Sequence, residues 1–392
     1  THRIVYQRKV TVKTIRTRCP YPFQIIVLFF VILTGCSQGG EATHPVMLVT
    51  PNEEVDTGST IRPSQITDSP GEGIAGLAAV KHWLYLLDSE LDEDLLQQIA
   101  ASPYDMVVLD YVPFEIDRED FPVAQVIERL HDASHPKLVL AYIDIAEAES
   151  FRTYWNDDWR IGDPDWILGD DPVGWAVDFP VAFWNDEWQS IWMGEDGLLR
   201  QVLDMDYDGV YLDWVAAYED EIVTEAARRD AVDAKSEMIA WVGSISETIR
   251  QACARCVIVA QNPADLVADE EFRRSIDAVA HVWFDGGVDN RPQGDCPLPR
   301  TADEIDTRAY RESLSTACRR QYDDYPDGTL HGSSEEYLEE LSFARSQGLV
   351  VFSVDYALEV ENIIWILQTS RSYGFVPFVG ARALDRYIEI VE

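Results

Sequence analysis

Beyond about residue 81, short apolar runs alternate with longer segments whose apolar residues recur at helical spacing. Runs with strand character are Trp83–Leu87, Met106–Val112, Leu138–Ile143, Gly209–Leu212, Val257–Ala260, Ala278–Phe284, Leu349–Val354 and Phe375–Val379. Helical patterns lie between most of them, at Leu91–Ala100, Val123–Leu130, Glu221–Gln251, Ser334–Gln347 and Asn362–Ser372. Continuous apolar strands separated by helices are typical of a parallel sheet with both faces covered. Eight such strands predict an α/β fold, a (β/α)₈ TIM barrel.

The alternative fold is a doubly wound open sheet. The first strand is followed by no glycine-rich phosphate turn, and the sequence contains no GxGxxG or Walker motif. The barrel is therefore the favoured prediction.

Polar residues follow the strands at the positions where each apolar run ends. They are Asp88, Asp110 with Tyr111, Asp144, Asp213 with Trp214, Asn262, Asp285, and Asp355 with Tyr356. Any one acid could instead cap a helix or lie in a loop. In a barrel, however, the carboxyl ends of the strands form the active site. Crowded carboxyl groups shift one another's pKa values, and a carboxyl pair of unequal pKa is what glycosidic cleavage requires.

A long segment, Ile145–Asp208, separates the third strand from the fourth. It holds seven of the twelve tryptophans: Trp155, Trp159, Trp166, Trp175, Trp184, Trp188 and Trp192. Long barrel loops are usually functional, and aromatic rings stack on the C–H faces of sugars. The same rings could simply give the loop a core of its own, and we expect that of about five of them.

The chain is strongly acidic, with 31 Lys and Arg against 70 Asp and Glu. Such a surface repels nucleic acid and anionic lipid headgroups. It suits a cationic ligand, although most of these charges are explained by an ordinary solvated acidic surface.

The first 36 residues have the pattern of an export signal. Six basic residues precede the apolar run Ile25–Leu33, which is short for a membrane span, and Leu33-Thr34-Gly35-Cys36 follows. The tetrapeptide resembles a bacterial lipoprotein signal, in which Cys36 is lipidated; an ordinary secretory signal is the alternative. Residues 37–76 are rich in Gly, Pro, Ser and Thr and predict a flexible linker, with the barrel at 77–392. We expect an exported, membrane-anchored protein on the periplasmic or cell-surface side.

Four cysteines remain in the predicted barrel: Cys253, Cys256, Cys296 and Cys318. An even number in an exported chain indicates disulfides, whose pairing the sequence leaves open. The Cys253–Cys256 spacing could also suit zinc or redox chemistry, but no second CxxC accompanies it. A metal-dependent hydrolase is a weaker alternative, because the chain has no HExxH motif and no His-x-His pair.

The segment Ala141–Glu149, with Phe151-Arg152 and Tyr154-Trp155, resembles the YISIGEAExYRxYW signature of glycoside hydrolase family 114. The resemblance extends through Val108–Tyr111, Trp175–Trp188, Gly209–Asp213, Met238–Val242 and Gln261–Pro263. It implies a (β/α)₈ barrel, secretion, and endo-α-1,4-polygalactosaminidase activity on a cationic galactosamine polymer. It also implies that Asp213 is catalytic and that a Glu just past the sixth strand is its partner.

The sequence departs from the family at that second position. Asp277–Asp285 contains no Glu, so Asp285 or His281 would have to replace it, and Ala146 stands where the family has Gly. We assign Asp213 and Asp285 as catalytic residues. The predicted substrate-binding residues are Asp110, Tyr111, Tyr142, Asp144, Glu147, Arg152, Trp155, Trp214, Asn262, His281, Asp355 and Tyr356. The prediction is a monomeric glycosidase without a cofactor or metal; the alternative is a catalytically silent barrel that binds a cationic exopolysaccharide.

Overall fold

The computed structural model describes residues 70–87, 89–171, 177–194, 196–284, 295–324, 329–331 and 333–390. All of them belong to one compact unit, residues 59–392. The predicted signal, Cys36 and the linker up to residue 69 lie outside the described residues. None of the described helices is long and apolar enough to cross a membrane.

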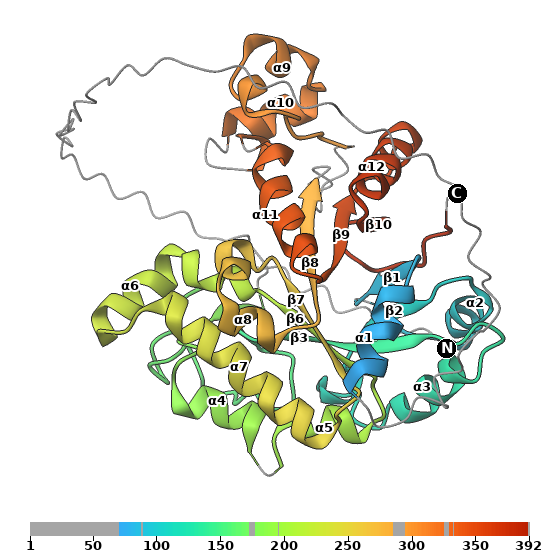
Figure 1. Cartoon of the computed structure of the whole chain (residues 1–392). Helices are drawn as coiled ribbons and strands as arrows, with labels where there is room; N and C mark the ends of the chain where they lie inside the picture. The colour runs from blue at the N-terminus through green and yellow to red at the C-terminus, as the bar shows by residue number, and fades with distance from the viewer. Residues whose placement is uncertain are drawn as a thin grey trace, which may run out of the picture. The chain divides into compact units, whose positions relative to one another are not determined.

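Eight parallel strands form the main sheet of the described chain (Figure 1). In sheet order they are β1 (Trp83–Leu86), β2 (Met106–Asp110), β3 (Leu138–Asp144), β6 (Gly209–Asp213), β7 (Val257–Gln261), β8 (Ala278–Phe284), β9 (Val350–Tyr356) and β10 (Val376–Gly380). The order follows the chain without reversal, unlike that of a doubly wound sheet. Each lies within two residues of a predicted strand.

The first and last strands lie side by side and nearly close the sheet. The indole Nε1 of Trp83 donates to the carbonyl of Val376 at 3.0 Å, and the amide of Leu87 donates to Leu384 at 2.9 Å. Aromatic rings fill the space inside: Trp83 lies 5.3–6.1 Å, between ring centroids, from Tyr85, Tyr211, Phe352 and Phe378. A sheet curled around a packed interior is the barrel arrangement, so the prediction of a (β/α)₈ fold is confirmed.

Helices cover the outside of the sheet (Figure 1). They include α2 (Glu93–Ala101), α3 (Val123–His131), α6 (Glu221–Asp230), α7 (Ala234–Ala252), α8 (Glu270–Ser275), α11 (Ser334–Ser346) and α12 (Val360–Tyr373). The single helix predicted over Glu221–Gln251 is in fact two, α6 and α7. Ala231 adopts a left-handed conformation (φ 59°) that ends α6, and the side chain of Asp233 accepts from the amide of Ser236 to begin α7.

Helix α1 (Pro70–Ala79) precedes the first strand and begins inside the stretch predicted as linker. It packs against the N-terminal ends of β3 and β7. A Cβ on Gly73 would lie 2.1 Å from the carbonyl oxygen of Arg255, so glycine permits the close approach. Leu77 is fully buried in the same contact. The many small residues of this segment favour close packing here and not only flexibility.

The described part of the segment between β3 and β6 has secondary structure of its own. It contains a two-stranded antiparallel sheet of β4 (Glu147–Glu149) and β5 (Asp178–Pro180), followed by α4 (Asp186–Met193) and α5 (Leu198–Asp204). Trp166, Trp188 and Trp192 are buried, whereas Trp155, Trp159 and Trp184 are partly exposed; Trp175 lies outside the described residues. The indoles of Trp188 and Trp241 both donate to the carbonyl of Ile145. Tryptophans therefore bind this segment to the barrel.

A small insertion follows β8. It contains α9 (Arg308–Ser313), α10 (Thr316–Asp324) and three-residue 3₁₀ turns at Ala302–Glu304 and Thr329–His331. A separate apolar cluster and the Cys296–Cys318 disulfide hold it together. Asp295 fixes one end, because its carboxylate accepts from the amides of Leu358 and Glu359 before α12. Among the described residues Cys253 and Cys256 form a second disulfide.

Aspartates at the N-terminal ends of alternate strands link each strand to the one before it. Asp105, Asp208 and Asp277 directly precede β2, β6 and β8, and accept from the backbone amides of His82, Val139 and Ile258, respectively, at 2.9 Å. These amides belong to the starts of β1, β3 and β7. The repeated dipeptides Tyr104-Asp105 and Tyr207-Asp208 carry this feature in the sequence, which the sequence analysis did not use.

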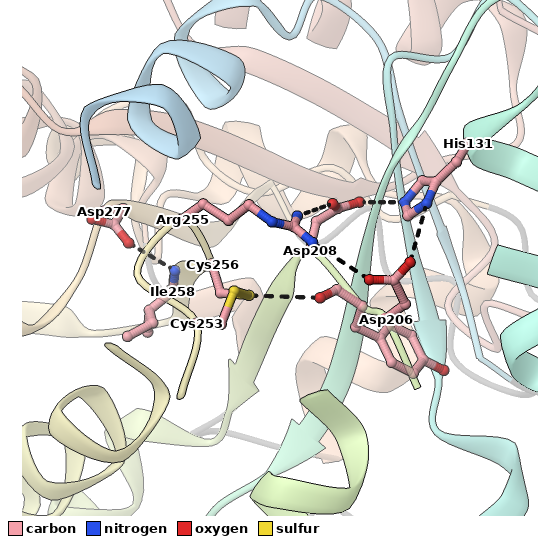
Figure 2. Close-up of a disulfide and its surroundings, with 9 residues drawn as sticks. His131, Asp206, Asp208, Cys253, Arg255, Cys256, Ile258 and Asp277 are labelled. Carbon is pink, nitrogen blue, oxygen red and sulfur yellow. Dashed lines mark hydrogen bonds and ion pairs between the residues drawn. A yellow bond between two sulfur atoms is a disulfide. The ribbon is translucent and has the colours of Figure 1, made fainter. Parts of the chain in front are cut away.

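Asp208 is buried and also bonds to two charged or titratable side chains (Figure 2). It accepts from Arg255 Nη1 at 3.0 Å and lies 2.8 Å from Nε2 of His131. Burial lowers the pKa of His131, but the hydrogen bond and charge of Asp208 outweigh burial, so that pKa is raised. The Cys253–Cys256 disulfide encloses Arg255 and holds its loop against Asp208.

We expect Asp208→Ala to lower the free energy of unfolding by about 3–5 kcal/mol, because Arg255, His131 and the amide of Val139 would lose a buried partner. Asp204→Ala is the matched control: its ion pair with Arg200 is mostly exposed, and its loss should cost about 0–1 kcal/mol. Urea denaturation of both variants measures the difference. Equal losses would show that the strand-linking aspartates are dispensable.

Candidate active site

Acids from neighbouring strands meet at the carboxyl edge of the sheet, as predicted. In the strand register Asp144 of β3 pairs with Asp213 of β6, and Asp110 of β2 pairs with Tyr142 of β3. Adjacent strands lie about 4.8 Å apart, so these side chains occupy one shared region. The strand-end acids Asp88 and Asp285 lie outside the described residues.

Asp213 is partly exposed and receives three hydrogen bonds. Tyr142 Oη donates to Oδ2 at 2.7 Å, the amide of Trp214 donates to Oδ1 at 2.7 Å, and the side-chain amide of Gln261 also donates to Oδ1. Trp214 adopts a left-handed conformation (φ 51°). Burial raises the pKa of Asp213, while the three donors favour its ionised form and act in the opposite direction.

Gln261 is itself oriented by the barrel interior. Tyr211 Oη donates to Oε1 of Gln261 at 2.5 Å, which leaves the amide nitrogen to face Asp213. Tyr211 is fully buried and packs beside Tyr85. The packed aromatic interior thus sets the hydrogen bonding of Asp213 from below.

Asp144 and Glu147 are buried carboxyl groups beside Asp213. Oδ1 of Asp144 accepts from the amides of Ala146 and Glu147 at 2.9 and 2.8 Å. Burial, then the charge of Asp213, raises the pKa of Asp144 well above its usual value. Burial, then Asp144, raises the pKa of Glu147 to about 12. Oε1 of Glu147 is buried without a hydrogen-bond partner.

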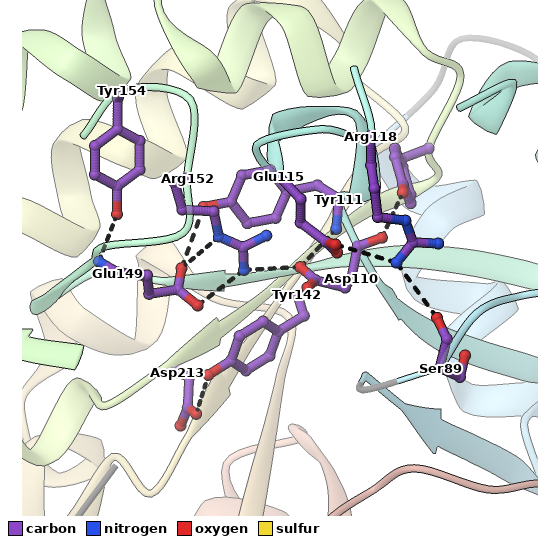
Figure 3. Close-up of polar contacts among 11 residues, drawn as sticks. Ser89, Asp110, Tyr111, Glu115, Arg118, Tyr142, Glu149, Arg152, Tyr154 and Asp213 are labelled. Atoms are coloured by element: carbon purple, nitrogen blue, oxygen red, sulfur yellow. Dashed lines mark hydrogen bonds and ion pairs between the residues drawn. The ribbon is translucent and has the colours of Figure 1, made fainter. Parts of the chain in front are cut away.

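Arg152 holds the acids on the other side of the site (Figure 3). Its guanidinium donates to both carboxylate oxygens of Glu149 at 2.8 Å and to Oδ1 of Asp110 at 2.9 Å. It lies over the ring of Tyr111, 4.1 Å from the centroid. Burial raises the pKa of Glu149, and Arg152 opposes that rise. The predicted sugar-binding residues Asp110, Tyr111 and Arg152 are buried and bind one another.

The β4–β5 ladder adds two acids that sequence reasoning missed. Glu149 pairs with Asp178 in that ladder. Burial, then Glu149, raises the pKa of Asp178 to about 8, and its Oδ1 is buried without a hydrogen-bond partner. Glu149 belongs to the quoted family signature and stands three residues before Arg152, a signal that could have identified it. Asp178 has no such signal, because its place depends on a long-range strand pair.

Because side chains alternate along a strand, the remaining predicted site residues do not all face the barrel interior. Ser353 of β9 donates to Ser370 of α12, so Asp355, two residues later, also faces the helices, whereas Tyr356 faces the interior. His281 packs against Tyr337 of α11, and burial lowers its pKa to about 4. Asn262 accepts from the amide of Val282. Trp155 stacks on Phe179 and meets Trp159 edge-on.

Two hollows of the described surface lie beside the tryptophan-rich segment. One of about 410 Å³ is lined in part by Phe114, Tyr154 and Leu198, and one of about 260 Å³ by Trp166 and Arg229. Neither is lined by Asp213 or Asp144. Tyr154 nevertheless joins the first hollow to the site, because its Oη accepts from the amide of Glu149. No group of three His, Cys, Asp or Glu within the described ranges could hold a metal ion.

Residues 82–392 match the model of glycoside-hydrolase family GH114. The chain belongs to this family. Its resemblance to family 114 is thereby confirmed, and with it the assignment to the glycoside hydrolases.

Among curated relatives, an uncharacterized protein of Deinococcus radiodurans is 28% identical over 327 residues, covering 83% of this chain and 88% of that protein. The uncharacterized protein MJ1477 of Methanocaldococcus jannaschii is 30% identical over 211 residues, 52% of this chain and 57% of its own length.

Two solved structures are also similar to this GH114 chain. The glycoside hydrolase domain of PelA from Pseudomonas aeruginosa has a TM-score of 0.46 at 16% identity, covering 80% of this chain and 98% of that one. Ega3 of Aspergillus fumigatus, solved in complex with galactosamine, has a TM-score of 0.48 at 15% identity, covering 79% and 95%.

The buried acids of this GH114 site predict that stability falls as pH rises above about 4. In the unfolded chain these carboxyls ionise near pH 4, whereas in the folded chain raised pKa values keep them protonated. The folded chain therefore binds more protons, and each such group lowers the free energy of unfolding by up to ~1.4 kcal/mol per pH unit. For Asp178 this loss should end near pH 8.

Urea denaturation between pH 4 and pH 8 checks this, with Asp178→Asn as the diagnostic variant. The variant should lose stability less steeply over that range, because it has no carboxyl to ionise. Asp204→Asn, on the exposed face of α5, is the control and should keep the original slope. Identical slopes for Asp178→Asn and the unsubstituted chain would contradict the prediction.

Proposed function

We propose that this chain hydrolyses glycosidic bonds in an amino-sugar polymer, α-1,4-linked galactosamine being the substrate that the family resemblance implies. The observation that carries the proposal is Asp213: a partly exposed carboxyl, at the carboxyl edge of the barrel, that receives three hydrogen bonds. Such donors keep a carboxylate ionised and oriented. Glycosidases need one carboxylate of this kind at the anomeric carbon.

The neighbouring residues have different tasks in this proposal. Arg152 with Asp110 and Tyr111 forms a buried brace that positions the β4 segment. Tyr142 and Trp214 hold Asp213 and border the space in front of it. Asp285, which the sequence suggests as the second catalytic carboxyl, stays a prediction because it lies outside the described residues.

Recognition of the polymer rests on charge. Galactosamine carries a free amine, which is cationic at neutral pH, and a crowd of carboxyl groups attracts it. Glu147 supports this, because its unpartnered Oε1 could accept from an ammonium group and give up its proton in return. An ammonium near Glu147 would lower the raised pKa of that carboxyl.

Export and anchoring complete the proposal. A lipid on Cys36 and a linker over residues 37–76 would hold a monomeric barrel at the membrane surface, where an exopolysaccharide is accessible. The acidic surface, net charge −39, is suited to a polycation and not to nucleic acid.

A silent binding module is the second candidate, and one observation favours it. Phe352 of β9 faces the barrel interior and pairs with Ala280 of β8, so Ala278, Ala280 and Val282 are the described β8 side chains that face inward. All three are apolar. In the part of β8 whose side chains are described, no carboxyl group points toward Asp213.

We expect Asp213→Asn to lower kcat on deacetylated galactosamine oligomers by about 10²–10⁴-fold while KM changes little, because the amide keeps the shape but not the charge. Reducing-end release measures the rate. Asp204→Asn should match the unsubstituted chain. Binding without cleavage, equal in the unsubstituted chain and in Asp213→Asn, would establish the silent module instead.

The same oligomers with acetylated amines test the charge argument. Acetylation removes the positive charge, so binding should weaken, and the remaining affinity should lose its salt dependence. Calorimetry with Asp213→Asn separates binding from cleavage. Equal affinity for acetylated and free oligomers would exclude amine recognition.

A further inference from the structure

Asp285 lies outside the described residues, and the described side chains of β8 offer Asp213 no carboxyl partner. Among the described β8 side chains, those of Ala278, Ala280 and Val282 face the interior. His281, on the opposite face, packs against Tyr337 of α11. The two-carboxylate mechanism is taken from the proposed function. A second carboxyl for it is found on a strand beside β6.

Asp144 is the carboxyl that the strand register places next to Asp213. The two residues are direct partners in the β3–β6 ladder, and neighbouring parallel strands are about 4.8 Å apart. Tyr142, two residues before Asp144 and hence on the same face, reaches Asp213 with its hydroxyl at 2.7 Å. Both acids thus end their strands on the interior face, at the same height.

We propose that Asp144 is the second catalytic carboxyl, the general acid that protonates the leaving oxygen, while Asp213 acts at the anomeric carbon. Retaining glycosidases hold their two carboxyl groups ~5–5.5 Å apart and inverting ones ~6.5–9.5 Å apart, and this assignment predicts the shorter separation.

Hydrogen bonds and burial differ between Asp213 and Asp144, and this difference decides which of the two carboxyls carries a proton. Asp213 receives donors on both oxygens, from Tyr142, Trp214 and Gln261, which favours its ionised form. Asp144 receives its two backbone donors on Oδ1 alone. Burial and then the charge of Asp213 raise the pKa of Asp144 well above its usual value. Asp144 is the member of the pair that holds a proton.

A second observation indicates that this region receives a polar ligand. Glu147 is only 6% exposed, its Oε1 has no hydrogen-bond partner, and it interacts electrostatically with both Asp144 and Asp213. A buried, unpartnered carboxyl oxygen is costly unless a ligand or water satisfies it. A sugar hydroxyl or ammonium placed between the three acids would do so.

The reaction balances with these two residues and water. The Asp144 proton passes to the glycosidic oxygen as the C1–O bond breaks and its electron pair goes to that oxygen. An oxygen of Asp213 forms a bond to C1. Water then attacks C1, its proton returns to Asp144, and the bond to Asp213 breaks. No metal, cofactor or redox partner is consumed.

The competing explanation is that Asp144 merely supports the turn at Ala146 and Glu147, whose amides it accepts. Leaving-group dependence separates the two explanations. Galactosamine oligomers need a proton on the departing oxygen, whereas a dinitrophenyl glycoside of the same oligomer does not. A general acid matters only for the former.

We expect Asp144→Asn to lower kcat on oligomers by about 10²–10⁴-fold but on the dinitrophenyl glycoside by less than about 10-fold. Asp213→Asn should lose both activities, and Asp204→Asn neither. Asparagine can still accept from both amides, and circular dichroism with thermal melting checks that the turn survives. Equal losses on the two substrates, or full oligomer activity, would overturn the assignment of Asp144.

Carbon-13 NMR of the aspartate carboxyls gives a readout that does not need turnover. Charged or titratable groups facing Asp144 are Asp213 on β6, Glu147 and Glu149 on β4, Asp178 on β5, Tyr142 on β3, Tyr154 after β4 and Tyr85 on β1. Asp144 should remain protonated to a higher pH than Asp213, and Asp213→Asn should lower the pKa of Asp144, because the charge of Asp213 raises it. The reverse order of titration would refute the assignment. If the unsubstituted chain cleaves neither substrate, the proposed function fails, and the titration still decides which carboxyl holds the proton.

Discussion

The acidic edge of this barrel depends on the hydrogen bonds of one buried guanidinium, that of Arg152. Arg152 is fully buried, and its hydrogen bonds to Glu149 and Asp110 join the β4 segment to β2. Buried charges persist only when paired or hydrogen-bonded, so Arg152 favours the ionised form of Glu149, as three neutral donors do for Asp213. Glu147 and Asp178 have no such partner, and burial raises their pKa values. The site thus combines carboxyls that receive hydrogen bonds with buried acids of raised pKa, and Arg152 braces the acids on the β2 side.

Much of the fold could be predicted because the strands are short apolar runs between helices. Eight strands were recovered almost residue for residue, since a parallel sheet buried on both faces leaves a continuous apolar signature. Features without such a signature were missed. Helix α1 is made of small residues whose packing depends on the backbone of Arg255, and the break between α6 and α7 depends on one left-handed alanine. Both depend on tertiary structure more than on local pattern.

Burial of the sheet on both faces also explains why the site residues were predicted only in part. Every strand-end acid was a candidate, because the sequence of a parallel strand does not say which face points inward. Alternation brings Asp144 and Asp213 to the interior, but it turns Asp355 and His281 toward the helices. The predicted strand Val257–Ala260 ended one residue before β7 does, so the predicted site residue was Asn262 and not Gln261. Gln261 is the last residue of that strand and reaches Asp213, whereas Asn262 turns to the backbone of Val282.

The two ends of the barrel use aspartate for opposite purposes. At the N-terminal end, Asp208 and Asp277 are paired with Arg255 and Arg250 and accept from strand amides, so removing them costs stability. At the carboxyl end, Asp144 lies beside another acid, a placement that lowers stability once the group ionises. A chain selected only for stability would not retain that neighbour. The place of Asp144 next to Asp213 is explained if the pair must share a proton. The aspartates that link the strands at the opposite end of the barrel supply stability that such a site removes.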